Sequence, residues 1–151
     1  MAAQFMVYRV TDVRRFDQIN ANDLWSFAKT ATNVGVTTAT DLHARVADEN
    51  VDNYLEVTRD PGYPLRLVPA AGCLTMSIEE GPEHVRGLKR HNNSKLFFGL
   101  CKIMTDGSIQ GFTGRLKWPG YFNGKPNGIW NLPPKTLCDM VEAYHAAGLQ
   151  M

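Results

Sequence analysis

Two apolar, β-prone runs flank Asp106 and Gly107, and this pattern organises the rest of the chain. An Asp-Gly pair suits the two-residue turn of a β-hairpin, because that turn needs positive φ angles. We therefore predict that residues 95–118 form a hairpin at the centre of the fold. Alternation along its two strands predicts a core face made of Phe97, Cys101, Ile103, Phe112, Leu116 and Trp118. The opposite face carries Leu96, Phe98, Leu100, Lys102, Arg115 and Lys117.

Helical periodicity appears on both sides of this hairpin. The N-terminal helix is predicted from the spacing of Leu24, Phe27, Ala28, Ala31 and Val34. Asn20 or Asn22 can cap its start, and Gly35 ends it. The C-terminal helix, residues 134–146, is predicted from the stripe formed by Leu137, Met140, Val141 and Tyr144. A short helix begins near Pro82, which suits a first helical turn.

Further strands are predicted at residues 5–10, 53–58, 65–68 and 73–78. Residues 42–46 alternate like a strand but also fit a short helix. Because strands and helices are mixed without regular β-α-β alternation, we expect an α+β fold. It would have a mostly antiparallel sheet with the central 95–118 hairpin, and an N-terminal and a C-terminal helix packed on that sheet. The length of 151 residues fits a single domain, residues 1–151.

Composition indicates an ordinary globular protein, with 44% hydrophobic and 21% charged residues. The sequence shows no membrane-spanning run and no secretory signal at its N-terminus. Its three cysteines are far apart, which suggests free thiols in a reducing compartment and offers no close-spaced metal pair. We therefore expect a cytoplasmic protein without a metal centre or cofactor, and the sequence leaves its oligomeric state open.

The charge is distributed unevenly along the chain. Residues 1–83 contain 7 basic and 12 acidic residues, whereas residues 84–135 contain 9 basic residues and one acidic residue, Asp106. A field of one sign attracts ligands of the other sign. Cations suit phosphates and aromatic rings suit bases, so this segment predicts binding of a nucleic acid or a nucleotide. The candidate ligand-binding residues are Arg86, Lys89, Arg90, Lys102, Arg115, Lys117, Trp118 and Tyr121.

The same residues are also consistent with a solvated basic surface over an aromatic core. Neither a P-loop nor a dinucleotide-binding glycine pattern is present. A protein-interaction or structural role, in which the basic face meets an acidic partner, therefore remains open as a further alternative.

A small hydrolase is the alternative from another functional class. His43 and Cys73 are its candidate catalytic residues, since imidazole and thiol groups serve as bases and nucleophiles. A two-histidine phosphoesterase would need two His-x-Thr or His-x-Ser strands. The first would be His43-Ala44-Arg45, which lacks the hydroxyl, and the second Gly111-Phe112-Thr113, which lacks the histidine. The sequence therefore assigns no enzyme family, and His43 and Cys73 are also compatible with structural roles.

Overall fold

The computed structural model describes residues 20–151, so the strand predicted at residues 5–10 lies outside the described part. The chain divides into two compact units. Of the described residues, unit 1 contains residues 20–71 together with Lys89–Phe98, and unit 2 contains Gly72–Leu88 and Gly99–Met151. The prediction of a single domain stays a prediction.

Unit 1 begins with helix α2, Ala21–Asn33, which confirms the predicted N-terminal helix. Asn20 caps it in a capping box: its Oδ1 accepts the Asp23 N–H at 3.0 Å, and the Asp23 carboxylate accepts the Asn20 N–H at 3.5 Å. These bonds satisfy backbone donors that have no partner inside the helix. Gly35 follows the helix with φ of 85°, a conformation that glycine adopts without strain.

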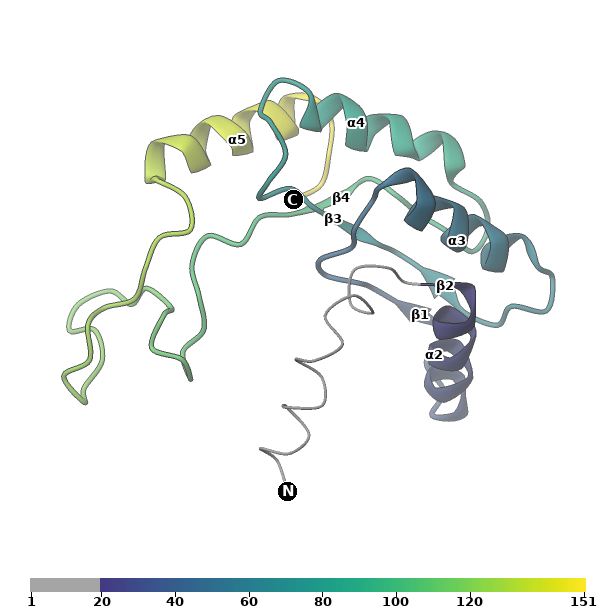
Figure 1. Cartoon of the computed structure of the whole chain (residues 1–151), viewed down its shortest axis with the longest axis horizontal. Helices are drawn as coiled ribbons and strands as arrows, with labels where there is room; N and C mark the ends of the chain where they lie inside the picture. Colours follow the sequence, from purple (N-terminus) through teal and green to yellow (C-terminus); the bar gives the residue numbers. More distant parts are fainter. Residues whose placement is uncertain (1–19) are drawn as a thin grey trace. The chain divides into compact units, whose positions relative to one another are not determined.

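Helix α3, Asp48–Arg59, corrects the strand predicted at residues 53–58. Leu55 and Val57 alternate as a strand would, but burial follows the helical spacing of Val51, Leu55 and Thr58 instead. Asp48 and Glu49 lie in the first turn, where the helix dipole favours negative charge. In Figure 1, α2 and α3 lie beside the strands of unit 1.

The described residues contain two short, two-stranded sheets. The prediction of a mostly antiparallel sheet is therefore wrong. Strand β1, Thr38–Ala39, pairs in parallel with β2, Arg66–Leu67, and α3 lies between them in the sequence. Leu67 also forms a parallel bridge with Leu96. Parallel neighbours require a long crossover, and α3 supplies it.

Strand β3, Ala70–Gly72, ends at the start of unit 2, and β4, Leu100–Lys102, is its partner in a second two-stranded sheet. The strand predicted at residues 73–78 is wrong, because this segment forms turns that lead into helix α4, Gly81–Leu88. That helix confirms the prediction near Pro82, and a 3₁₀ turn, Lys89–His91, continues it.

Residues 95–118 do not form a hairpin, so the central element of the predicted fold is wrong. Asp106 lies in a bend, and its carboxylate accepts the Arg115 N–H at 2.7 Å, which closes a loop instead of a two-residue turn. Phe97 is 54% exposed and Phe98 is 1% exposed, the reverse of the predicted faces. Phe112 is 37% exposed and has φ of 55°.

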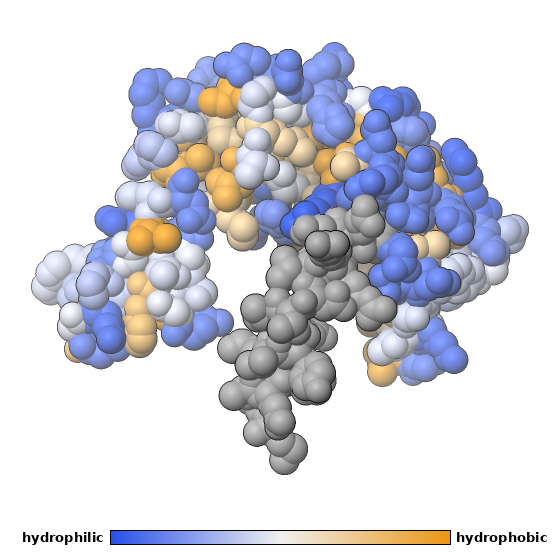
Figure 2. All heavy atoms as spheres, in the orientation of Figure 1, coloured by the Kyte–Doolittle hydropathy of each residue, from blue (hydrophilic) through white to orange (hydrophobic). Residues whose placement is uncertain are grey.

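Residues 105–133 form an extended loop region in unit 2, held by side chain to backbone bonds. The Asn127 side-chain amide makes two hydrogen bonds with the Leu116 backbone. Its Oδ1 accepts the Leu116 N–H at 2.8 Å, and its Nδ2 donates to the Leu116 carbonyl at 2.6 Å. Trp118 and Phe122 are almost fully exposed, at 94% and 97%. In Figure 2, hydrophobic side chains reach the visible surface of this loop region, at lower left.

Helix α5, Pro134–Ala146, confirms the predicted C-terminal helix with the predicted bounds. Of the predicted stripe, Met140 and Tyr144 are buried, whereas Val141 is 43% exposed. Within unit 2, α5 packs against α4. None of the helices within residues 20–151 is long and apolar enough to cross a membrane. The cytoplasmic location stays a prediction.

Candidate functional site

A pocket of about 350 Å³ lies in unit 1 among α2, α3 and the β1–β2 pair. Its wall is mainly apolar, with two carboxylates and two hydroxyl groups. The lining residues are Asp23, Leu24, Phe27, Ala39, Thr40, Asp41, Tyr54, Leu67, Val68 and Pro69. Cavities of this kind, apolar with a few polar groups, are the usual form of small-molecule sites.

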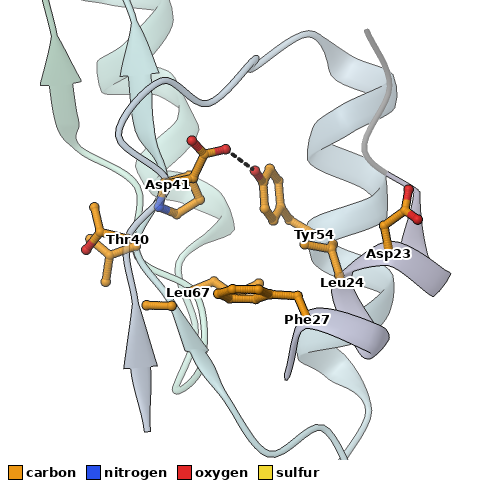
Figure 3. Close-up of a pocket in the computed structure, with 10 residues that line it drawn as sticks. Asp23, Leu24, Phe27, Thr40, Asp41, Tyr54 and Leu67 are labelled. Carbon is orange, nitrogen blue, oxygen red and sulfur yellow. Dashed lines mark hydrogen bonds between the residues drawn. The ribbon is translucent and has the colours of Figure 1, made fainter. Parts of the chain in front are cut away.

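Asp41 and Tyr54 approach each other from opposite sides of this pocket (Figure 3). The Tyr54 hydroxyl donates to Asp41 Oδ2 at 3.4 Å, and the His43 N–H donates to Asp41 Oδ1 at 3.0 Å. Burial, followed by the nearby Asp41 charge, raises the pKa of Tyr54, so its hydroxyl stays protonated as a donor. The Asp41 carboxylate is therefore held in place by contacts to both of its oxygens.

The apolar side of the pocket comes from α2 and β2. Phe27 reaches from α2 toward Leu67 in Figure 3, and its side chain is 50% exposed. Leu24 and Leu67 are buried, at 6% and 5%. An exposed aromatic ring beside buried leucines gives a ligand an apolar surface to contact.

The structure separates the two predicted catalytic residues between the units. His43 is exposed in unit 1, and its backbone, not its imidazole, holds the pocket carboxylate. Cys73 is fully buried in unit 2. These placements do not test a catalytic role for either residue, which stays a prediction.

Cys73 belongs to a buried cluster with Cys101 and Tyr144. Its N–H donates to the Lys102 carbonyl at 2.9 Å, which places it beside β4. The Cys101 thiol, with the Tyr144 hydroxyl, lowers the pKa of Cys73 to about 7, because both groups can donate hydrogen bonds to a thiolate. Burial and the charge on Cys73 raise the pKa of Tyr144.

The predicted ligand-binding residues are also divided between the units. Lys89 and Arg90 belong to unit 1, and the other six residues belong to unit 2. Arg86 forms an ion pair with Glu83, and the Arg115 guanidinium lies 4.9 Å from the centre of the Trp130 ring. The Tyr121 hydroxyl donates to the Gly114 carbonyl at 2.7 Å. None of these contacts identifies a nucleic acid or nucleotide as the ligand, so that binding stays a prediction.

Sequence reasoning missed the pocket because it gave Asp41 no role and placed Tyr54 in the strand predicted at residues 53–58. A signal for Tyr54 was present in the helical spacing of Asn50, Tyr54 and Thr58. No local signal could place Tyr54 beside Asp41, since the two lie 13 positions apart in the sequence and meet only in the fold.

No protein-family model matches the chain, and no curated protein does. A solved structure described as an uncharacterized metal-dependent hydrolase from Pyrococcus horikoshii OT3 is similar in fold, with a TM-score of 0.62 and 16% sequence identity. The match covers 87% of this chain and 27% of that protein, so the chain spans about a quarter of its length. At this identity, the likeness shows a shared fold.

The neighbour is described as metal-dependent. Residues 20–151 of this chain contain no group of three or more His, Cys, Asp or Glu side chains that could hold a metal ion. Asp23 and Asp41 supply two carboxylates at the pocket, fewer than the three protein ligands of a typical catalytic zinc site. The described residues by themselves therefore do not fit a metal centre.

Proposed function

We propose that this chain belongs to a hydrolase and contributes a pocket for a small organic substrate. The observation that carries the proposal is the fold shared with a metal-dependent hydrolase over 87% of this chain. The unit 1 pocket supports it, because an apolar cavity with a few fixed polar groups is what a small substrate needs. The hydrolase class was also an alternative from the sequence.

Each part of the pocket has a role in this proposal. The Phe27 ring and the leucines beside it remove the apolar part of a substrate from water, at roughly 25 cal/mol for each Å² buried. Asp41, held by Tyr54 and the His43 N–H, orients a polar group of the substrate. Because the carboxylate is already positioned, little ordering accompanies binding. The proposal assigns no reaction step to a metal, since the described residues do not fit one.

The test is a hydrolysis assay of the full chain on chromogenic carboxyl esters, anilides and phosphate monoesters. Each class is measured with EDTA and with added Zn²⁺, Mn²⁺ or Mg²⁺. We expect turnover of at least one class in proportion to protein concentration. The absence of turnover in every class, with and without divalent ions, would contradict the proposal.

Two phenylalanine variants test whether the activity comes from this protein and not from a contaminant, and whether it depends on the pocket. Phe27→Ala should raise KM several-fold with a smaller change in kcat, because it removes apolar contact area with the bound substrate. Phe97→Ala is the matched control: Phe97 has a similar exposure, 54% against 50%, lies in the same unit and does not line the pocket. We expect it to leave KM unchanged. Equal KM values in both variants would exclude this pocket as the substrate site.

A further inference from the structure

The charges at the unit 1 pocket have one sign. Asp23 comes from α2, and Asp41 follows β1 on the other side. None of the described lining residues is Lys, Arg or His. In an apolar cavity a carboxylate interacts with a cation more strongly than in bulk water. The pocket therefore disfavours anions and favours positively charged ligands.

The hydrogen bonds of Asp41 leave part of its carboxylate available. A carboxylate has about four lone-pair sites, and within residues 20–151 the His43 N–H and the Tyr54 hydroxyl fill two of them. The remaining sites can accept N–H groups of a ligand. Since both present donors fix the carboxylate orientation, an added N–H donor would meet an acceptor that is already in position.

An organic cation fits this pocket better than a metal ion does, for two reasons. The described residues provide no third His, Cys, Asp or Glu side chain to complete a metal site beside these two carboxylates. In addition, most of the pocket wall is apolar and includes the half-exposed ring of Phe27. An aromatic ring face attracts an ammonium group and also packs against an apolar body.

The size of the pocket limits the ligand further. Its volume of about 350 Å³ lies near the lower end of the roughly 300–1,000 Å³ range of ligand sites. We infer that the unit 1 pocket binds a small organic cation, an ammonium group attached to an aromatic or aliphatic body. As a substrate class this rests on the proposed hydrolase function, whereas binding itself does not require turnover.

Three probes of similar size and different charge test this inference on the full chain. They are 2-phenylethylammonium, 2-phenylethanol and 3-phenylpropionate, titrated by calorimetry or by amide chemical shifts. We expect the ammonium to bind roughly five- to tenfold more tightly than the alcohol, with the carboxylate weakest, and added salt to reduce the difference. Equal binding of the ammonium and the alcohol would overturn the inference, as would no binding of either.

A variant that removes the Asp41 charge tests whether the preference for the ammonium arises in the pocket. Asp41→Asn keeps the side-chain shape and removes the charge, so the ammonium should lose its advantage while the alcohol affinity stays. Glu56→Gln is the matched control, because it makes the same charge change at an exposed position of α3 that does not line the pocket. Thermal melting checks that each variant is folded, and Asp23→Asn provides a second test if Asp41→Asn unfolds. A persistent ammonium preference in the folded Asp41→Asn variant would contradict the inference.

Failure of this inference can be told apart from failure of the proposed function. A chain that binds 2-phenylethylammonium selectively and hydrolyses nothing would refute the hydrolase proposal alone. A chain that hydrolyses neutral or anionic substrates without selecting the ammonium would refute the ligand class alone.

Discussion

Cys73 shows how a single side chain acquires chemistry from its neighbours. It has no accessible surface, and burial by itself would raise the pKa of a thiol. The Cys101 thiol has the largest effect, and together with the nearby Tyr144 hydroxyl it lowers the pKa of Cys73 from 9.0 to about 7. Gly81 makes room for this arrangement, since a Cβ at that position would clash with the Tyr144 hydroxyl oxygen.

We predict that removing the Cys101 thiol raises the pKa of Cys73. The measurement is thiolate absorbance against pH in a Cys138→Ser background, which removes the exposed cysteine. The midpoint near 7 should move toward 9 in Cys101→Ala, because the hydrogen bond from Cys101 has been lost. An unchanged midpoint would contradict this assignment.

The same ionisation affects stability with a defined sign. The pKa of Cys73 is lower in the folded chain than its ordinary value, so the folded state favours the thiolate. Its contribution to the free energy of unfolding is fully present above pH 9 and disappears as pH falls through about 7. The free energy of unfolding should therefore rise between these values in the Cys138→Ser background and rise less in Cys101→Ala.

At the scale of an element, α5 shows that predicting a helix does not by itself predict which of its faces is buried. The periodic stripe identified the helix correctly, but the stripe is wider than the buried face. Met140 and Tyr144 are buried at 2% and 0%, whereas Val141 is 43% exposed. A period of 3.6 residues spreads four apolar positions over an arc, and the packing against α4 covers part of it.

Two aspartate variants on α5 test this difference. Met140→Asp should unfold unit 2, because it places a charge without a partner in the core. Val141→Asp introduces the same charge one position further along the helix, where the side chain is partly solvated, and should be tolerated with a much smaller loss. Far-ultraviolet circular dichroism and thermal melting measure both. Similar melting of the two variants would refute the burial of this face.

At the scale of the whole molecule, the charge asymmetry remains without an assigned ligand. Residues 84–135 combine 9 basic residues with a single acidic one, and both units contain part of this segment. Solvation accounts for each exposed lysine or arginine individually. Solvation accounts less well for the near absence of acidic residues from the segment 84–135. Nucleic-acid or nucleotide binding therefore stays a prediction.

A salt titration of binding to single-stranded DNA, RNA and nucleotides tests that prediction. If phosphates are bound, affinity should fall steeply with salt, because each neutralised phosphate releases counterions. Combined Arg115→Ala and Lys117→Ala changes should weaken binding and flatten this dependence. Lys29→Ala with Arg59→Ala removes the same charge from α2 and α3 and should have less effect. No binding to any probe at low salt would exclude the prediction.

The sequence by itself determined the elements whose signals are local. For α2, the cap at Asn20 and the apolar spacing lie within one short segment, and the same holds for α5 and for α4 after Pro82. Helix hydrogen bonds join residues four positions apart, so neighbouring side chains suffice to predict them. The charge asymmetry is likewise a property of the sequence.

Only the tertiary structure decided which segments pair and where the pocket lies. The Asp106-Gly107 pair favoured a hairpin. Instead, Leu100 forms a parallel β-bridge with Gln150, and the Asp106 carboxylate accepts the Arg115 N–H. Residues 53–58 alternate like a strand, and α3 forms because a helix buries Tyr54 and Leu55 together. Strand pairing and the contact of Tyr54 with Asp41 join distant positions, so their energies depend on the folded chain and not on local sequence.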